Sequence, residues 1–596
     1  MPDVVGRAGT WWKAAAGCAI CASLVAGVIE DTRRWVWDRT VGWVVPAQAS
    51  FDTCLSRQMV ALQRPEGALY QVIVTVPSGD PDRDAFRQIE TSLTRAYGET
   101  QTAAIRVGAL DCEPLKPTAG DSAERLATAR ARADALLAGT GADAVLWGEV
   151  FADGKTMELR FAYPPEPDQG TDRAAIYEAG AITLDLNFGK DIGALIAARA
   201  LDRTVAIAGS DRLDQGAVSA QILALLSPLV TARPSGISDE NYAEVLFSEA
   251  LAAGTAAVAA ADGAGLLAAA DRLQMAEALY PPEATAKRDY ARIFAAYLRA
   301  NAASLLPADQ ARRALARAIA ELTELAPRVL VLFGPNMVQA LESALGLAIT
   351  MAAVSMPEPE RSATMQDGNA RLRAAAVAWP DPALLLQFAT GVYTRASVSD
   401  DRTALALNVE ATAANDRALA GLPDGERGVI WLRAMTLKGE LLLQRALLEN
   451  EPDPAATLDQ AIAVLTDAVT VAMGTAAAAD RAKAQSALGW ALVGRALQSG
   501  DAPEVADLLA RAEPALRAAL TVYGPASSPL FWGWTLEGLA FAGVSCANTP
   551  GCGDPNALRA ETAARFVAAA DAFHVAGQEA HVARVLALSQ KFGPTP

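Results

Sequence analysis

The sequence predicts a multidomain protein with one transmembrane helix, a small α/β domain and a mainly α array of helical hairpins. An uncharged apolar stretch lies near the amino terminus, strands alternate with helices over 68–200, and a pattern recurs about every fifty residues over 427–592. A chain of 596 residues is too long for one core. We expect a membrane anchor with its juxtamembrane segment at 1–50 and an α/β domain at 51–203. A helical connector at 204–237 and an α-solenoid at 238–596 are expected to follow.

The charge balance and the scarcity of histidine exclude several classes of function. Lys+Arg 51 against Asp+Glu 68 gives a net charge of −17, which disfavours a nucleic-acid partner. The two histidines, His574 and His581, are separated by a predicted turn at Gly577, and no carboxylate completes a ligand set around them. We therefore predict no catalytic residue, no metal and no cofactor, and we expect that the protein is not an enzyme.

The amino-terminal anchor is predicted from residues 14–29, which carry no charge. They are fewer than the roughly 20 residues that span a bilayer, but Lys13 can snorkel and Trp11 and Trp12 suit the membrane interface. We expect a retained single-pass anchor in a bacterial inner membrane. A buried core helix and a cleaved signal peptide remain alternatives. Basic residues flank the stretch on both sides, so the side of the membrane that holds the soluble body stays open.

The cysteines fall into three groups. Cys18 and Cys21 lie in the apolar stretch, Cys54 and Cys112 are isolated, and Cys546 and Cys552 flank a Pro-Gly turn. The last pair is predicted to form a disulfide in an oxidising compartment, and to remain free thiols at a loop in a reducing one.

The α/β domain is predicted from β-branched runs that alternate with amphipathic helices. The expected strands are 70–77, 104–110, 142–150, 157–162 and 181–188, and the expected helices are 84–97 and 123–138. This order, with the strand Ala142-Asp-Ala-Val-Leu-Trp-Gly-Glu149, resembles the amino-terminal domain of TolB-like bacterial envelope proteins. The resemblance implies a non-catalytic domain that mediates protein contacts.

One segment of this domain is similar to a phosphate-binding loop. Gly148 and Gly154 precede Lys155 and Thr156, but five residues separate the glycines where the loop needs four. The segment also leads into a strand, whereas a phosphate loop leads into a helix. We therefore predict a β-hairpin turn here.

Prolines divide the next part of the chain into helices. Ser238 is placed to cap the first of them, after the linker 234–239. The expected helices are 240–262, 264–279, 285–304, 307–326, 335–355, 358–378, 382–396 and 402–420. Breaks at short intervals are typical of antiparallel hairpins.

The clearest internal order is a repeat of small and apolar positions in helix pairs. In each first helix a glycine precedes a bulky apolar residue by three positions: Gly439/Leu442, Gly489/Leu492 and Gly538/Phe541. In the second helices Ala461/Leu465/Ala468 returns as Ala512/Leu516/Ala519, and Phe566/Ala569 repeats the last two members. Small residues allow close helix packing, so the repeat predicts stacked hairpins.

These pairs resemble tetratricopeptide repeats, as Leu488-Gly489 with Leu492 and the second-helix positions show. The usual unit is about 34 residues, whereas this period is about fifty. The resemblance implies that first helices line a concave face. Trp431, Trp490, Trp532 and Trp534 lie near first helices and are interpreted either as core residues or as a partner-binding surface.

The sequence therefore favours a membrane-anchored scaffold or adaptor that binds a protein or peptide through its helical repeats. The alternative is a ligand-sensing receptor, with a small-molecule site at the carboxyl ends of strands 70–77, 104–110 and 142–150.

Overall fold

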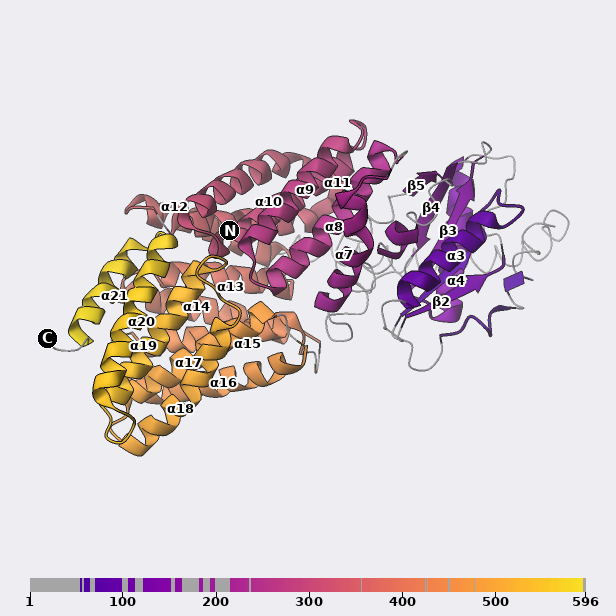
Figure 1. Ribbon diagram of the computed structural model, residues 1–596. Helices are drawn as coiled ribbons and strands as arrows, with labels where there is room; N and C mark the ends of the chain where they lie inside the picture. The colour runs from indigo at the N-terminus through magenta and orange to yellow at the C-terminus, as the bar shows by residue number, and fades with distance from the viewer. Residues whose placement is uncertain are drawn as a thin grey trace, which may run out of the picture.

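The computed structural model describes the sheet and the helical array. The described residues are 54–55, 58–64, 70–98, 105–112, 122–151, 156–162, 182–185, 193–198, 215–234, 237–354, 356–423, 425, 427–448, 451–475 and 478–592. The anchor predicted at 14–29 lies outside them. Mainly helical structure follows a small mixed sheet along the chain (Figure 1).

The sheet has five strands in the order β2-β1-β3-β4-β5. The strands are β1 (Tyr70–Thr75), β2 (Ile105–Leu110), β3 (Ala144–Val150), β4 (Thr156–Ala162) and β5 (Ile182–Asp185). β1 is parallel to β2 and β3, because a helix crosses between consecutive parallel strands. β3, β4 and β5 pair antiparallel. β4 begins at Thr156, one residue before the predicted strand 157–162, and the predicted turn at 153–154 lies outside the described residues.

Helices cover both faces of the sheet. On one face α3 (Asp84–Gly98) contributes Ile89 and Leu93 to a core that holds Val72 and continues into the helical array. On the other face α4 (Ser122–Thr140) packs with Leu62 against the opposite side of the strands. Alternate residues of a strand point to opposite faces, so the nearly continuous apolar run of β1 serves both cores.

The array begins with helices that share the core of the sheet. Its first elements are α7 (Gln215–Thr231), α8 (Asp239–Ala259), α9 (Gly263–Leu279), α10 (Thr285–Ala302), η2 (Ala303–Leu305) and α11 (Ala308–Ala353). The hydroxyl of Ser238 accepts a hydrogen bond from Asn241 N at 3.2 Å, which confirms the predicted cap of α8.

The array continues as successive helix pairs. Its further elements are α12 (Glu360–Ala378), α13 (Pro382–Ala396), α14 (Asp401–Ala420), α15 (Val429–Ala446), α16 (Pro454–Thr475), α17 (Ala478–Gln498), α18 (Ala502–Leu520), α19 (Pro529–Ala547), α20 (Pro555–Val575) and α21 (Glu579–Phe592). Within the described residues, Pro454–Ala472 of α16 alone is long and apolar enough to cross a membrane. This stretch packs between α15 and α17 as a member of the array.

The predicted break between helices 307–326 and 335–355 is wrong. α11 runs without interruption from Ala308 to Ala353 and contains Pro327 and Pro335. A proline removes one backbone donor and crowds the preceding turn, but it does not prevent a helix whose two halves are both packed. Buried Leu325 and Leu345 anchor the two halves in one core.

The repeat positions of first and second helices meet each other. A Cβ atom added at Gly439 would clash with the side chain of Leu465, and one added at Gly489 would clash with Leu516. Each leucine therefore occupies the space that the glycine leaves free. The third pair departs from this pattern, because Gly538 faces Leu516 and Trp490 of the preceding pair.

The helices form two layers. The helices α11, α13, α15, α17 and α19 pack on one another in series, whereas α12, α14, α16, α18 and α20 pack closely with their neighbours in the chain. In a curved two-layer array, the layer in which alternate helices approach each other lies on the concave side. We call the side of this layer that faces away from the second helices the inner face.

The curvature brings the end of the array back to its beginning. Ala261, at the end of α8, packs in one cluster with Tyr523 and Trp532 from either side of the α18–α19 connection. Gly577, between α20 and α21, lies against Ala308 at the start of α11. The yellow carboxyl-terminal helices accordingly lie beside the magenta and rose ones in Figure 1.

Candidate partner-binding surface

The inner face is the side of each first helix that lies away from its repeat glycine. At about 100° per residue, Arg433 and Glu440 lie about 20° apart around α15 and at least about 100° from Gly439. Gly439 faces the second helix, α16, through Leu465. Arg433 and Glu440 therefore project from the opposite side of α15.

Charged and tyrosine side chains meet on this face. Arg433 donates Nε and Nη2 to the two carboxylate oxygens of Asp480 on α17, at 2.8 and 3.1 Å. In the reverse direction, Lys483 Nζ on α17 lies 3.1 Å from Glu440 Oε2 on α15. With two tyrosines, these residues form what we call the inner-face cluster: Tyr297, Tyr393, Arg433, Glu440, Asp480 and Lys483.

The tyrosines come from other helices of the array. Tyr393 lies on α13, and burial followed by the charge of Glu440 raises the pKa of its phenol. Burial has the largest single effect on the pKa of Arg433 and lowers it, but the Asp480 carboxylate and Tyr297 on α10 together raise this pKa above its ordinary value. Tyr297 is 37% exposed. The cluster thus joins α10, at the start of the array, with α13, α15 and α17.

The sequence pattern contains a signal for this face that the prediction did not use. The position six residues before the repeat glycine holds Arg433, Lys483 and Trp532 in consecutive first helices. The position one residue after it holds Glu440 and Trp490. Tryptophan, tyrosine and arginine are the residue types that dominate protein interfaces.

The four tryptophans predicted for this surface occupy different environments, and each is half-buried. Trp490 and Trp534 form an edge-to-face pair with ring centroids 6.4 Å apart, and Trp490 Nε1 donates to Trp534 O at 3.1 Å. Trp532 packs where the end of the array meets its beginning. Trp431 packs beside Leu432, with the Arg427 guanidinium 5.3 Å from its ring centroid. All four make internal contacts, and Trp490 and Trp532 occupy inner-face positions.

The two histidines lie on different helices. His574 is on α20, with Nδ1 2.9 Å from Glu579 Oε1, whereas His581 is on α21. His581 packs on Trp534 with ring centroids 4.7 Å apart. Burial, and then the nearby Arg584, lower its pKa. Arg584 makes two hydrogen bonds to the fully buried Glu537, which fastens α21 to α19. His581, Arg584 and their partners on α19 therefore have a structural role.

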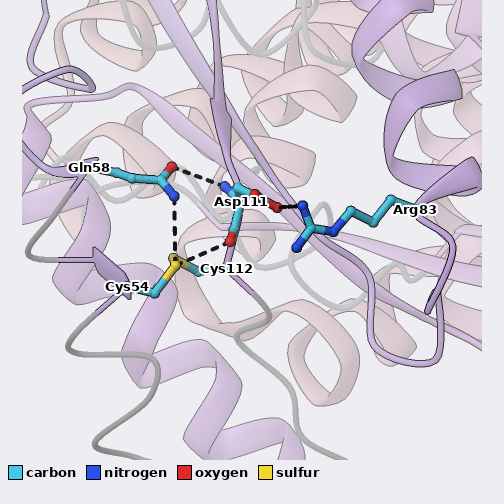
Figure 2. Close-up of a disulfide and its surroundings, with 5 residues drawn as sticks. All are labelled: Cys54, Gln58, Arg83, Asp111 and Cys112. Carbon is cyan, nitrogen blue, oxygen red and sulfur yellow. Dashed lines mark hydrogen bonds and ion pairs between the residues drawn. A yellow bond between two sulfur atoms is a disulfide. The ribbon is translucent and has the colours of Figure 1, made fainter.

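Two disulfides join the described cysteines. Cys546 and Cys552 close the loop between α19 and α20, with Cα atoms 5.3 Å apart. The second disulfide, Cys54–Cys112, has a Cα separation of 6.0 Å and was not predicted from the sequence. The two half-cystines are 58 residues apart in the chain. The Cys54–Cys112 disulfide ties the segment before the sheet to the end of β2 (Figure 2).

The edge of the sheet that the receptor hypothesis requires is held by internal bonds. Asp111, directly after β2, pairs with Arg83, and its backbone N donates to Gln58 Oε1 at 3.2 Å (Figure 2). Ser78, after β1, exchanges backbone hydrogen bonds with Gly148 and Val150 of β3. The described residues at this edge therefore bind each other, and the inner face is the better candidate site.

Comparisons with known proteins name no relative for this chain. No protein family matches the sequence, and no curated protein matches it significantly. A solved structure described as "Circular tandem repeat protein with novel repeat topology and enhanced subunit contact surfaces" aligns with 86% of this chain and 96% of its own, at 11% identity. The TM-score is 0.20, which is too low to define a shared fold.

Proposed function

We propose that the protein is a membrane-anchored scaffold or adaptor of the bacterial envelope that binds a protein partner through the inner face. The observation that carries this proposal is the inner-face cluster, in which Tyr297 of α10 lies within electrostatic reach of Arg433 on α15, and Tyr393 of α13 lies within reach of Glu440 on α15. Stacked helical hairpins offer extended concave surfaces of this kind, which other repeat proteins use for binding. The proposal includes a likeness of the array to tetratricopeptide repeats and of the sheet domain to the TolB-like amino-terminal domain.

The experiment compares affinity purification of three forms of the tagged full-length chain. Tyr297→Ala removes an exposed ring from the inner face, and Val409→Ala removes a 59%-exposed side chain from α14 in the outer layer. We expect partner recovery to fall about tenfold for Tyr297→Ala, because a truncated hot-spot residue costs about 1.4 kcal/mol or more. Recovery with Val409→Ala is expected to match the unaltered chain. Equal recovery with both variants would argue against the inner face.

We also propose that the soluble body lies on the oxidising side of the membrane. The support is the pair of disulfides, Cys54–Cys112 and Cys546–Cys552, since disulfides persist in the bacterial periplasm and are rare in the cytosol. Alkylation of intact cells without reductant, followed by mass spectrometry of the purified chain, is expected to leave these four cysteines unlabelled. Full labelling of the four would place the body in a reducing compartment.

A further inference from the structure

The ion pairs of the inner face are asymmetric in their exposure. The side chain of Arg433 is 44% exposed, whereas its partner Asp480 is 13% exposed. In the neighbouring pair Lys483 is 40% exposed and Glu440 is 16% exposed. The cationic side chain is therefore the more exposed member of each pair.

Arg433 and Lys483, the two cations of these pairs, have unused hydrogen-bonding capacity. Arg433 donates through Nε and Nη2, which leaves Nη1 without a protein partner among the described residues. Lys483 has one carboxylate neighbour for an ammonium group with three donors. The charge of each pair is balanced, and Arg433 Nη1 has no carboxylate partner among the described residues. An arriving carboxylate would complete both sets of hydrogen bonds.

A tyrosine near Arg433 adds to the preference of this site for a carboxylate. Tyr297 on α10, which is 37% exposed, lies within electrostatic reach of Arg433. A phenol can donate one hydrogen bond to an anionic acceptor. The chain as a whole carries −17, whereas the two pairs are neutral and expose mainly their cationic members.

We propose that the inner face recognises an acidic peptide segment of its partner, with Arg433 and Lys483 binding its carboxylate side chains. This inference rests on the proposed function and specifies the chemistry of the partner. The net charge of the chain repels an acidic peptide, so saturable binding of such a peptide requires a local cationic site.

The test uses fluorescence anisotropy with the full-length chain and a labelled deca-glutamate peptide, against a Gly-Ser peptide of equal length. One variant exchanges the members of each pair: Arg433→Asp with Asp480→Arg, and Lys483→Glu with Glu440→Lys. The exchange retains the contacts between α15 and α17 but places carboxylates at the exposed positions. The control exchanges an outer-layer pair on α18, Arg517→Glu with Glu513→Arg.

We expect the unaltered chain and the α18 control to bind deca-glutamate with equal affinity, and the inner-face exchange to weaken binding at least tenfold. Equal thermal unfolding of the two exchanged variants excludes misfolding as the cause; if the inner-face exchange unfolds, Lys483→Gln alone is measured, with at least a threefold loss expected. Deca-glutamate binding no better than the Gly-Ser peptide, or unaffected by these changes, would overturn the proposal. Loss of partner recovery in Tyr297→Ala would still support the proposed function in that case.

Discussion

At the scale of single residues, the repeat glycines set the distance between the two helices of a hairpin. In Gly439→Ala the new methyl group would overlap Leu465, and in Gly489→Ala it would overlap Leu516. We expect each variant to be destabilised by about 1–3 kcal/mol in chemical denaturation, as for other overpacked cores. Gly500→Ala is the control, since nothing lies within 4 Å of its added Cβ.

The double variant Gly439→Ala with Leu465→Ala separates overlap from helix propensity. Removing the leucine side chain makes room for the methyl group, so the Gly439→Ala change should cost less in this background than in the unaltered chain. An equal cost in both backgrounds would contradict the proposed packing of glycine on leucine.

The buried histidine predicts a dependence of stability on pH. The pKa of His581 lies below its ordinary value of 6.5, mainly because of burial, and its Nδ1 has no hydrogen-bond partner among the residues that the structure describes. The unfolded chain therefore binds a proton more readily, so this residue should lower the free energy of unfolding as the pH falls below about 6.5. In His581→Gln, thermal unfolding between pH 7 and pH 5 should change less steeply than in the unaltered chain.

The second histidine is the matched control. The side chain of His574 is 71% exposed, and its pair with Glu579 is at the surface. His574→Gln should therefore follow the pH profile of the unaltered chain, because exposed ion pairs contribute little. A flatter profile in His574→Gln than in His581→Gln would contradict the assignment.

Residues differ in how far the sequence predicts their role. Gly439 and Gly489 are visible as a repeat because close packing demands the same small residue in each unit. Arg433, Lys483 and Trp532 share one repeat position but differ in chemistry, so composition alone does not group them. Their common face becomes evident only when the glycine is known to face the second helix.

At the scale of elements, α11 shows where local rules fail. Pro327 is exposed within a helix that continues on both sides, so it removes a backbone hydrogen bond without ending the helix. Pro327→Ala should restore that bond and raise the free energy of unfolding by up to about 3 kcal/mol. Chemical denaturation measures this change.

Pro382→Ala provides the comparison for Pro327→Ala. Pro382 is at the amino-terminal end of α13, where its missing donor has no intrahelical partner in any case. This variant should therefore gain no stability from a new hydrogen bond. An equal gain in both variants would indicate that Pro327 also lies at a helix end.

The other elements are predicted well because proline, glycine and capping residues mark their ends. α13 spans Pro382–Ala396 as predicted, and the sheet contains the five predicted strands. The Cys54–Cys112 disulfide was not predictable, because its half-cystines are far apart in the chain and meet only after β2 joins the sheet.

At the scale of the whole molecule, curvature is the property that the sequence does not predict. Each hairpin contributes a small rotation, and only the sum brings Tyr523 and Trp532 back to Ala261. The same curvature places Tyr297 of α10 within electrostatic reach of Arg433 of α15. The candidate site therefore depends on the shape of the array as well as on the residues of one repeat.

The most direct test of the account is site-specific photocrosslinking in cells that contain the full-length chain. A photoreactive phenylalanine derivative replaces Tyr297 or Tyr393 on the inner face, or Val409 on the outer layer. We expect one protein partner to crosslink from positions 297 and 393 and not from position 409. Crosslinking of that partner from position 409 alone would contradict the proposal that the inner face is the binding surface.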